Sequence, residues 1–435
     1  MFDTFRNAWK IQDLRKKILY TVMVIVVFRL GCAIPVPFIR PEALQAWVGE
    51  TGNLLGYIDM LTGGAFARCT LFALSVTPYI NASIIIQLLT VAIPALEQLA
   101  KEGEEGRKKL TRITRYVGAG IGFALAIAYY FLLRGQGALL YTEGASAWFS
   151  AVVIVLTFTA GSLLIQWLGE QIDVKGIGNG ISLLIFAGII SRWSSVFTSA
   201  KNYLDLAAEG ETKYYFFLPL IVVLVLAVIV FIVILNAAER RIPVQYAKRV
   251  VGRKMYGGQS THIPIKVNMS GVMPIIFASS LISIPGTIGS FFPTLYDSTV
   301  HPVWAAILGA FQYSGWAYAV IYFLLIIGFN YFYVAIQYNP VEIANNLRNN
   351  NGTVPGYRPG KPTSDFITRV LGKITLVGAL FLGIVAVMPI VLGAVSGMNI
   401  ALGGTSLLIV VGVALDTSRS LESYMLMRHH KGFLE

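Results

Sequence analysis

The stretch GGAFARCTLFALSVTPYINASIIIQLLTVAI, residues 63–93, holds 31 mostly apolar residues with an arginine near its start and a proline in its middle. A membrane-spanning helix needs only about 20 residues. Pro78 would break a helix interior but suits the first helical position, and Thr77 before it fits an N-cap. We therefore expect one helix to begin at Pro78 and residues 63–75 to form a separate short helix.

The rest of the chain is also apolar. Of its 435 residues, 56% are hydrophobic and 13% are charged, and the mean hydropathy is +0.68, whereas soluble proteins carry about 25% charged residues. Long apolar blocks must be helices in lipid, where no water satisfies the backbone polar groups. The sequence therefore predicts an all-α polytopic membrane protein with ten transmembrane helices. The ten blocks cover roughly residues 18–38, 76–96, 115–134, 148–168, 179–197, 214–236, 270–291, 305–335, 374–393 and 401–417, and the overlong eighth block is expected to tilt or to project from the membrane.

Basic residues in the connecting loops give the orientation of these helices. The loops on the side that holds the N-terminus carry 27 lysines and arginines, and the opposite loops carry 6. This asymmetry is the positive-inside pattern, and one helix too many or too few would destroy it. We expect both termini to be cytoplasmic, and the net charge of +12 needs no nucleic-acid partner to explain it.

Segment 63–75 then falls on the external side. It is too short to span, begins with Gly63 and Gly64, and carries one charge. It either dips back into the membrane as a re-entrant helix, which requires burial in protein or a cavity to line, or lies on the surface as an amphipathic segment. The residues alone leave both interpretations open.

Two cytoplasmic loops are longer than turns require. Residues 239–268 alternate in polarity around GRKMYGGQS, which predicts a protruding β-hairpin with basic residues toward its tip. Residues 339–366 begin with Asn339 as a cap and Pro340 at the first helical position, which predicts a short helix followed by the stiff basic loop VPGYRPGKP. Basic loops suit an acidic partner, ribosomal RNA or lipid headgroups, and the length of these two favours a protein or ribosome partner.

The sequence offers no catalytic or metal-binding constellation. It has no phosphate-binding loop, no H-E-x-x-H motif and no cluster of cysteine and histidine, so we expect neither a cofactor nor a metal. Ionisable residues inside the apolar blocks are scarce, Arg29 being the clearest, whereas an ion-coupled transporter would hold them near the midplane. A passive conduit with an apolar centre is the favoured interpretation, and a secondary transporter is the alternative.

Several stretches beyond the opening one carry a resemblance to a known family. They are KEGEEGRKKLTRITRY (101–116), WLGEQIDVKGIGNGIS (167–182), RRIPVQYAKR (240–249), QSTHIPIKVNMSGVMPIIFASS (259–280), VPGYRPG (354–360) and GGTSLLIVV (403–411). Together they are very specific. Over essentially its whole length the sequence resembles the SecY family, the core subunit of the bacterial protein-conducting translocon.

The resemblance implies two five-helix halves, about residues 1–205 and 206–435, related as inverted repeats around an hourglass pore. Segment 63–75 would be a re-entrant plug helix that closes the pore from outside, and Ser75 stands where we expect a glycine, which could stiffen the plug hinge. A lateral gate would form between the second and third helices and the seventh and eighth, with Asn81 on it. The plug residues implied are Gly63, Gly64, Ala65, Phe66, Ala67, Arg68, Cys69, Thr70 and Leu71, and the pore ring implied is Val76, Ile80, Ile181, Ile185, Ile276 and Ile409.

Members of this family pass unfolded polypeptides outward and release hydrophobic segments sideways into lipid; they are not enzymes. The resemblance implies a bacterial cell-membrane protein with SecE and SecG as companion subunits, driven by the SecA ATPase or by a ribosome and serving preproteins with signal sequences. Arg358 is the residue expected to serve SecA. The full set of basic residues implied for motor or ribosome contacts is Arg240, Arg241, Lys248, Arg249, Arg253, Lys254, Arg348 and Arg358.

Overall fold

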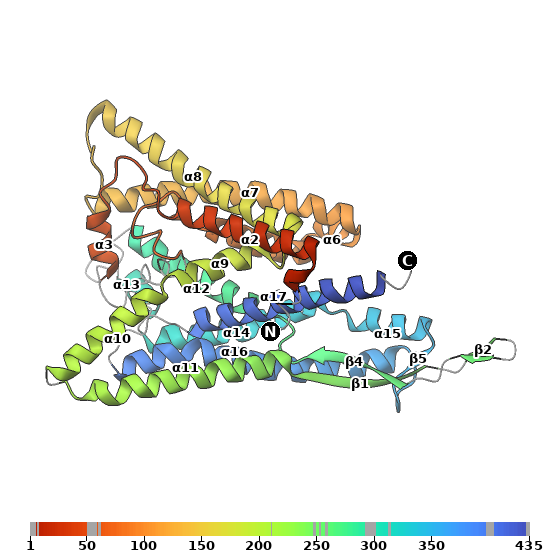
Figure 1. The fold of residues 1–435 in the computed structure, drawn as a ribbon. Coiled ribbons are helices and arrows are strands. Elements are labelled where there is room, and N and C mark those ends of the chain that lie inside the picture. Colours follow the sequence, from red (N-terminus) through yellow and green to blue (C-terminus); the bar gives the residue numbers. More distant parts are fainter. Residues whose placement is uncertain are drawn as a thin grey trace.

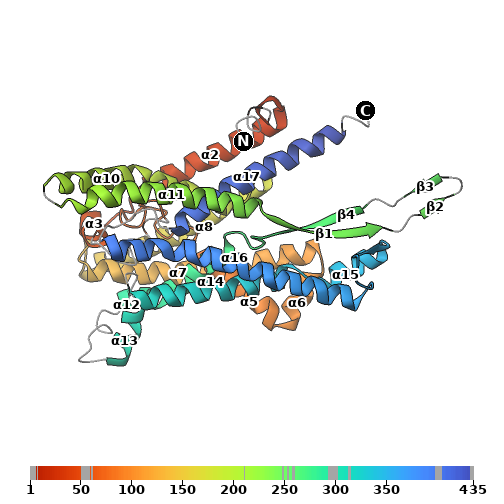
Figure 2. The same ribbon diagram turned by 90° about the horizontal axis from the view of Figure 1, so that it is seen from below.

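The computed structural model describes residues 6, 8–49, 59, 62–209, 211–246, 249–251, 254–256, 260–291, 302–311, 315–396 and 404–431. Long helices run side by side along one direction of the molecule (Figure 1). The start of α2, the end of α17, the strands β1 and β4 and helix α15 lie at one end, and α3, the α10–α11 turn and α13 lie at the other (Figure 2). This grouping of segments at two opposite ends agrees with the alternation predicted from the loop charges.

Each of the ten predicted blocks overlaps one of the helices named below, although the bounds differ by several residues. By length and composition, six helical runs in the described part of the chain can cross a membrane, and the pair α5–α6, bent by 102°, makes a seventh if it is one span. The protein is thus mostly helical and spans the membrane several times. The ten helices are α2 (Gln12–Gly31), α5 (Thr77–Ala92), α7 (Glu104–Gly135), α8 (Gly144–Lys175), α9 (Gly180–Ser191), α11 (Lys213–Ala237), α12 (Met273–Phe291), α14 (Trp316–Gln337), α16 (Lys361–Ser396) and α17 (Gly404–Lys431).

Shorter helices lie between the long ones, and one of them corrects the sequence prediction. They are α3 (Pro41–Gly49), α6 (Pro94–Lys101), α10 (Trp193–Ala208), α13 (Pro302–Ala310) and α15 (Pro340–Asn349). Block 305–335 was expected to be one overlong helix, and this is wrong: α13 ends at Ala310 and α14 begins at Trp316. Gly315 precedes α14 with an extended backbone, which ends helical hydrogen bonding at that point.

The opening stretch also folds differently from the prediction. Residues 62–76, which we call the turn segment, form successive turns and not a helix. Positive φ angles at Gly63, Gly64, Cys69 and Ser75 interrupt the right-handed helical path. Helix α5 follows with Val76 as its N-cap, without a side-chain capping bond, so Thr77 is already helical rather than the cap.

Apolar side chains form two local cores and one that joins them. The first local core uses only residues between 36 and 158, and the second uses only residues between 228 and 408. A third cluster combines α2, α5, α8 and α9 with α12 and α17. The early and late parts of the chain therefore have separate interiors and meet at this third cluster.

The predicted hairpin is confirmed. Strands β1 (Glu239–Tyr246) and β4 (Ser260–Lys266) pair antiparallel, and β5 (Gly352–Thr353) adds to the other edge of β1. Strands β2 (Arg249–Val251) and β3 (Lys254–Tyr256) continue the hairpin away from the helices (Figure 2). Along β1, Ile242 and Val244 are buried while their neighbours are exposed, which is the predicted alternation of period two.

Polar contacts tie the chain that follows the hairpin to three neighbouring helices. The Asn268 side chain donates to Oδ1 of Asn236 at 2.8 Å, and Ser270 donates to Asn330, whose amide donates to the Thr375 carbonyl at 3.0 Å. Asn330 is 3% exposed, so these bonds satisfy a buried amide. The chain between β4 and α12 is therefore held against α11, α14 and α16.

Candidate functional site

Four helices bring branched aliphatic side chains to the cluster that joins the two local cores. The cluster consists of hydrophobic residues, most of them aliphatic. Val76, Ile185, Ile276 and Ile409 are buried within it, and Ile80 and Ile181 are half-buried and pack against it. The structure therefore brings together, from α5, α9, α12 and α17, all six residues that the resemblance assigned to a ring.

The turn segment packs directly on this cluster. Ala65 and Phe72 are buried members of it, and the Phe72 ring stacks on Phe28 of α2 with centroids 5.8 Å apart. Two glycines permit the close approach: a Cβ on Gly31 would lie 2.0 Å from the Phe72 ring, and one on Gly161 would lie 1.9 Å from the Leu71 carbonyl oxygen. The backbones of α2 and α8 thus pack directly against the turn segment, with no side chain between them at Gly31 and Gly161.

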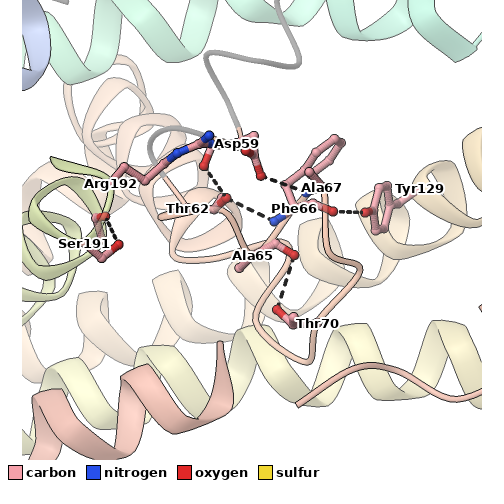
Figure 3. Close-up of polar contacts among 10 residues, drawn as sticks. Asp59, Thr62, Ala65, Phe66, Ala67, Thr70, Tyr129, Ser191 and Arg192 are labelled. Atoms are coloured by element: carbon pink, nitrogen blue, oxygen red, sulfur yellow. Dashed lines mark hydrogen bonds and ion pairs between the residues drawn. The ribbon is translucent and has the colours of Figure 1, made fainter. Parts of the chain in front are cut away.

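Polar side chains satisfy the backbone of the turn segment (Figure 3). The Ala67 N–H donates to Oδ1 of Asp59 at 2.8 Å, and the Phe66 N–H donates to the Thr62 hydroxyl at 3.2 Å. From α7, the Tyr129 hydroxyl donates to the Phe66 carbonyl at 2.6 Å. A buried segment without helical or strand bonding needs such partners, because an unpaired buried backbone group is expensive.

The residues predicted for this segment differ in exposure. Arg68 is exposed, whereas the small and apolar positions face the protein. Buried members are Ala65, Phe66, Ala67, Cys69 and Thr70, and half-buried ones are Gly63, Gly64 and Leu71. The segment therefore sits inside the protein, which excludes the surface-lying interpretation left open by the sequence.

Ser75 adopts a backbone conformation that favours glycine. It has a φ of 50° and is 6% exposed, and it is followed directly by Val76 and α5. An L side chain in the left-handed region costs roughly 1–2 kcal/mol, and glycine avoids this penalty. The structure thus gives a physical reason for the glycine that the resemblance led us to expect at this position.

Helix α12 lies against α5 and α7. Asn81 is half-buried on α5. Three of the four helices that the resemblance assigned to a lateral gate form this contact, and the fourth, α14, contacts α12 and α16. The gate assignment itself stays a prediction.

The elements that carry the described basic residues, β1 and α15 among them, lie at the opposite end from α3 and α13 (Figure 2). Arg240 and Arg241 are exposed on β1, with Arg241 Nε donating to Glu239 at 2.7 Å, and Arg348 is exposed on α15. Arg249 and Lys254 belong to β2 and β3, of which only the backbone is described, and Lys248 and Arg253 lie outside the described residues.

Arg358 is exposed on a loop whose backbone is fixed by its neighbours. Gly356 and Gly360 flank it with φ angles of 86° and 103°, and the Tyr357 ring stacks on Phe366 at 4.3 Å between centroids. The Arg358 carbonyl accepts from the Thr363 hydroxyl at 2.8 Å. The backbone is therefore fixed while the guanidinium group stays exposed.

Three functional candidates escaped the sequence analysis. Asp59 and Tyr129 contact the turn segment and Arg192 contacts Asp59, yet Asp59 and Arg192 are 133 positions apart. No periodicity or motif links residues at such a separation. By contrast, Met273 also packs on the apolar cluster and lies three positions before Ile276 on α12, so helical spacing could have found it. No group of three or more metal-ligating side chains occurs among the described residues.

The pattern of an apolar cluster, a buried turn segment and two separate cores can be compared with known proteins. The SecY family profile matches residues 70–418. The chain belongs to the SecY family. A subunit of this family is a protein-conducting channel component and not an enzyme.

Curated SecY relatives extend over the whole chain. The SecY translocase subunit of Thermotoga maritima is 41% identical over 444 residues, covering 100% of this chain and 98% of the relative. The SecY subunit of Halalkalibacterium halodurans is 42% identical over 445 residues, covering 100% of both chains. The chain is therefore a multi-pass membrane protein of the bacterial SecY family.

Solved structures share the fold. A structure described as that of a protein-conducting channel has a TM-score of 0.63 at 19% identity and covers 94% of this chain and 92% of its own. A structure of Sec61 in the canine ribosome–channel complex has a TM-score of 0.60 at 18% identity, again covering 94% of this chain and 92% of its own. At these identities the similarity concerns the fold.

Ser75→Gly should stabilise the packed turn segment, because glycine removes the strain of a positive φ. Hydrogen–deuterium exchange of peptides over residues 62–76 should slow by up to about fivefold, the equivalent of roughly 1 kcal/mol. Ser75→Val, whose branched side chain fits this region worse, should exchange faster than the wild type. Faster exchange in Ser75→Gly would mean that added chain freedom outweighs the relieved strain.

Proposed function

We propose that this chain forms the conduit itself, with Val76, Ile80, Ile181, Ile185, Ile276 and Ile409 as the pore ring. The observation that carries the proposal is the convergence of these six side chains, from four helices, on one apolar cluster. Such a constriction blocks ions by dewetting, yet it forms no directional bonds that a passing polypeptide would have to break.

The turn segment is proposed to be the plug. It covers the ring by packing Ala65 and Phe72 against the same cluster. One related structure is described as showing that the plug domain of its SecY protein stabilises the closed channel and maintains a membrane seal. Here the buried backbone bonds of the segment support an equivalent role.

Residues 1–205 and 206–435 are proposed as the two inverted halves. Support comes from the two local cores, which share no residues and are joined through the cluster that contains the ring. Because α5 and α7 meet α12 across this boundary, parting there would open a path sideways into lipid for hydrophobic segments, with Asn81 beside it. We assign the lateral gate to this contact.

The exposed basic loops are proposed to receive the partner that supplies energy. Secretory preproteins with signal sequences are the cargo, the SecA ATPase or a ribosome is the driver, and SecE and SecG are companion subunits. The canine Sec61 structure is of a ribosome–channel complex, and a yeast Ssh1 complex with a TM-score of 0.57 is described as bound to the 80S ribosome. Exposed arginines on β1, α15 and the Arg358 loop support the same use here.

We place the protein in the bacterial cell membrane with both termini in the cytoplasm. The loop charges, 27 against 6, support this orientation. Exposed tryptophans support the membrane boundary at the other end: Trp148 is 78% exposed at the start of α8, Trp316 is 81% exposed at the start of α14, and Trp304 on α13 is 53% exposed. Tryptophan favours the interface between lipid and water.

Polar substitution in the ring should open the seal without preventing folding. In reconstituted vesicles, Ile409→Asn and Ile185→Asn should raise ion conductance on the order of tenfold, since roughly 1.4 kcal/mol off the barrier has that effect. Both should also export a client whose signal sequence is weakened.

Ile384→Asn is the matched control for the ring. Ile384 is 60% exposed on α16, so the same change there should impair membrane insertion without raising conductance. Normal conductance and strict signal dependence in both ring variants would remove these residues from the pore.

Arg358→Glu should abolish motor-driven transport while leaving the yield of the complex unchanged. The arginine is exposed on a fixed loop, so charge reversal affects a partner rather than the fold. Transport of a presequence-bearing polypeptide with SecA and ATP should fall on the order of tenfold or more. Arg369→Glu, an exposed arginine on α16, is the control and should transport normally.

The same vesicles separate the two function classes. A translocon moves polypeptide only with SecA and ATP, whereas a secondary transporter would move a small solute along an ion gradient without either. Transport by Arg358→Glu at the normal rate would refute the motor assignment of this residue alone.

A further inference from the structure

A buried carboxylate lies between the plug and helix α10. The Asp59 side chain is 4% exposed and forms an ion pair with Nη1 of Arg192, whose side chain is 34% exposed. The other oxygen of this carboxylate, Oδ1, accepts from the Ala67 N–H of the plug at 2.8 Å. One carboxylate thus binds the plug on one side and a guanidinium group on the other (Figure 3).

The backbone of Asp59 adds to this junction. Its carbonyl accepts from the Gly64 N–H at 2.8 Å and from the Thr62 hydroxyl at 3.0 Å. Four contacts through Asp59 therefore fix the start of the plug, and only one of them, the ion pair, leads to an element outside this stretch. The ion pair is therefore the contact through which Asp59 attaches the start of the plug to the junction of α9 and α10.

Arg192 occupies a rigid position. It is both the C-cap of α9 and the residue before α10, and its N–H donates to the Ile189 carbonyl at 3.1 Å. Helix α9 carries the ring residues Ile181 and Ile185. The ion pair consequently attaches the plug to the end of a helix that lines the proposed ring.

Two arginines, Arg29 and Arg192, lie near this junction. A Cβ on Gly63 would lie 2.9 Å from Nη1 of Arg29 and 2.9 Å from the Ser191 hydroxyl, so a second guanidinium group lies beside the plug. Nη1 of Arg29 is buried and has no hydrogen-bond partner in the described part of the chain. Among the described residues, Asp59 is a carboxylate paired with one of these two arginines, Arg192.

We infer that Asp59 and Arg192 are positioning residues that hold the plug on the pore ring through their ion pair. The inference rests on the proposed function of residues 62–76 as the plug. While both partners are present, their charges compensate each other. Loss of one partner leaves an uncompensated charge on the other, which favours release of the segment into water. The plug then moves with Asp59 as one unit, because Ala67, Gly64 and Thr62 remain bonded to it.

The variants separate charge from shape. Arg192→Gln removes the cation, Asp59→Asn keeps an acceptor for the Ala67 N–H but removes the charge, and Arg192→Lys keeps the cation. Lys201→Gln is the matched control, because Lys201 is an exposed lysine on the same helix. Each is purified as the full complex and reconstituted, and ion leak and export of a client with a weakened signal are measured.

Arg192→Gln should leak roughly tenfold or more above wild type and pass the weakened client, while Arg192→Lys stays within about twofold of wild type. The double variant Asp59→Asn with Arg192→Gln should leak no more than Arg192→Gln alone, because it leaves no unpaired carboxylate. If the two residues had a purely structural role, the leaks of Asp59→Asn and Arg192→Gln would add in the double variant, and each single variant would lower the yield of the complex.

Equal leak in Arg192→Gln and Lys201→Gln would overturn the inference. If Ile409→Asn leaks in the same preparation, the proposed conduit stands and only the ion pair loses its role. If neither leaks, the conduit assignment fails first. Additive leak, or a loss of complex yield that the double variant does not repair, would also overturn the inference.

Discussion

The structure depends on how the backbone N–H and C=O groups of one segment without regular secondary structure find hydrogen-bond partners among membrane helices. Lipid offers no hydrogen bonds, so the backbone of residues 62–76 must be paired within the protein. Side chains from Asp59, Thr62 and Tyr129 supply part of this pairing, and the Leu71 N–H donates to the Ile34 carbonyl at 2.9 Å. Tyr129 and Ile34 lie outside the segment, so the position of the proposed plug depends on α7 and on the chain that follows α2.

Two kinds of contact close the proposed conduit: aliphatic packing in the ring, and hydrogen bonds with close backbone packing at the plug. The ring joins the early and late parts of the chain through aliphatic side chains, whose attraction has no direction and lets surfaces slide or part smoothly. The plug is held to the early part by directional bonds and by backbone approach at Gly31 and Gly161. In the proposed channel, widening of the ring and departure of the plug would therefore be separate events, because aliphatic contacts and directional bonds respond differently to a polar cargo.

Local signals in the sequence predicted the local structure. Asn339 accepts from the Val341 and Glu342 N–H groups at the start of α15, as its position before a proline indicated, and the alternation around Ile242 gave the hairpin. The conformation of residues 63–75 could not be predicted, because its small apolar residues are compatible with a helix and its positive φ angles follow from packing against α2 and α8. The Asp59–Arg192 pair, formed across 133 positions, lay beyond any pattern in the sequence.

The thiol of Cys69 can report the opening of the proposed plug through its rate of chemical labelling. This thiol is free, 1% exposed, and lies 3.5 Å from the Tyr129 hydroxyl, so a reagent in water meets it only after the segment has left its seat. If reseating is faster than modification, the labelling rate measures the fraction of time spent open; if it is slower, the rate measures how often opening occurs. A single sulfur atom thus distinguishes a channel that opens often and briefly from one that opens seldom and stays open.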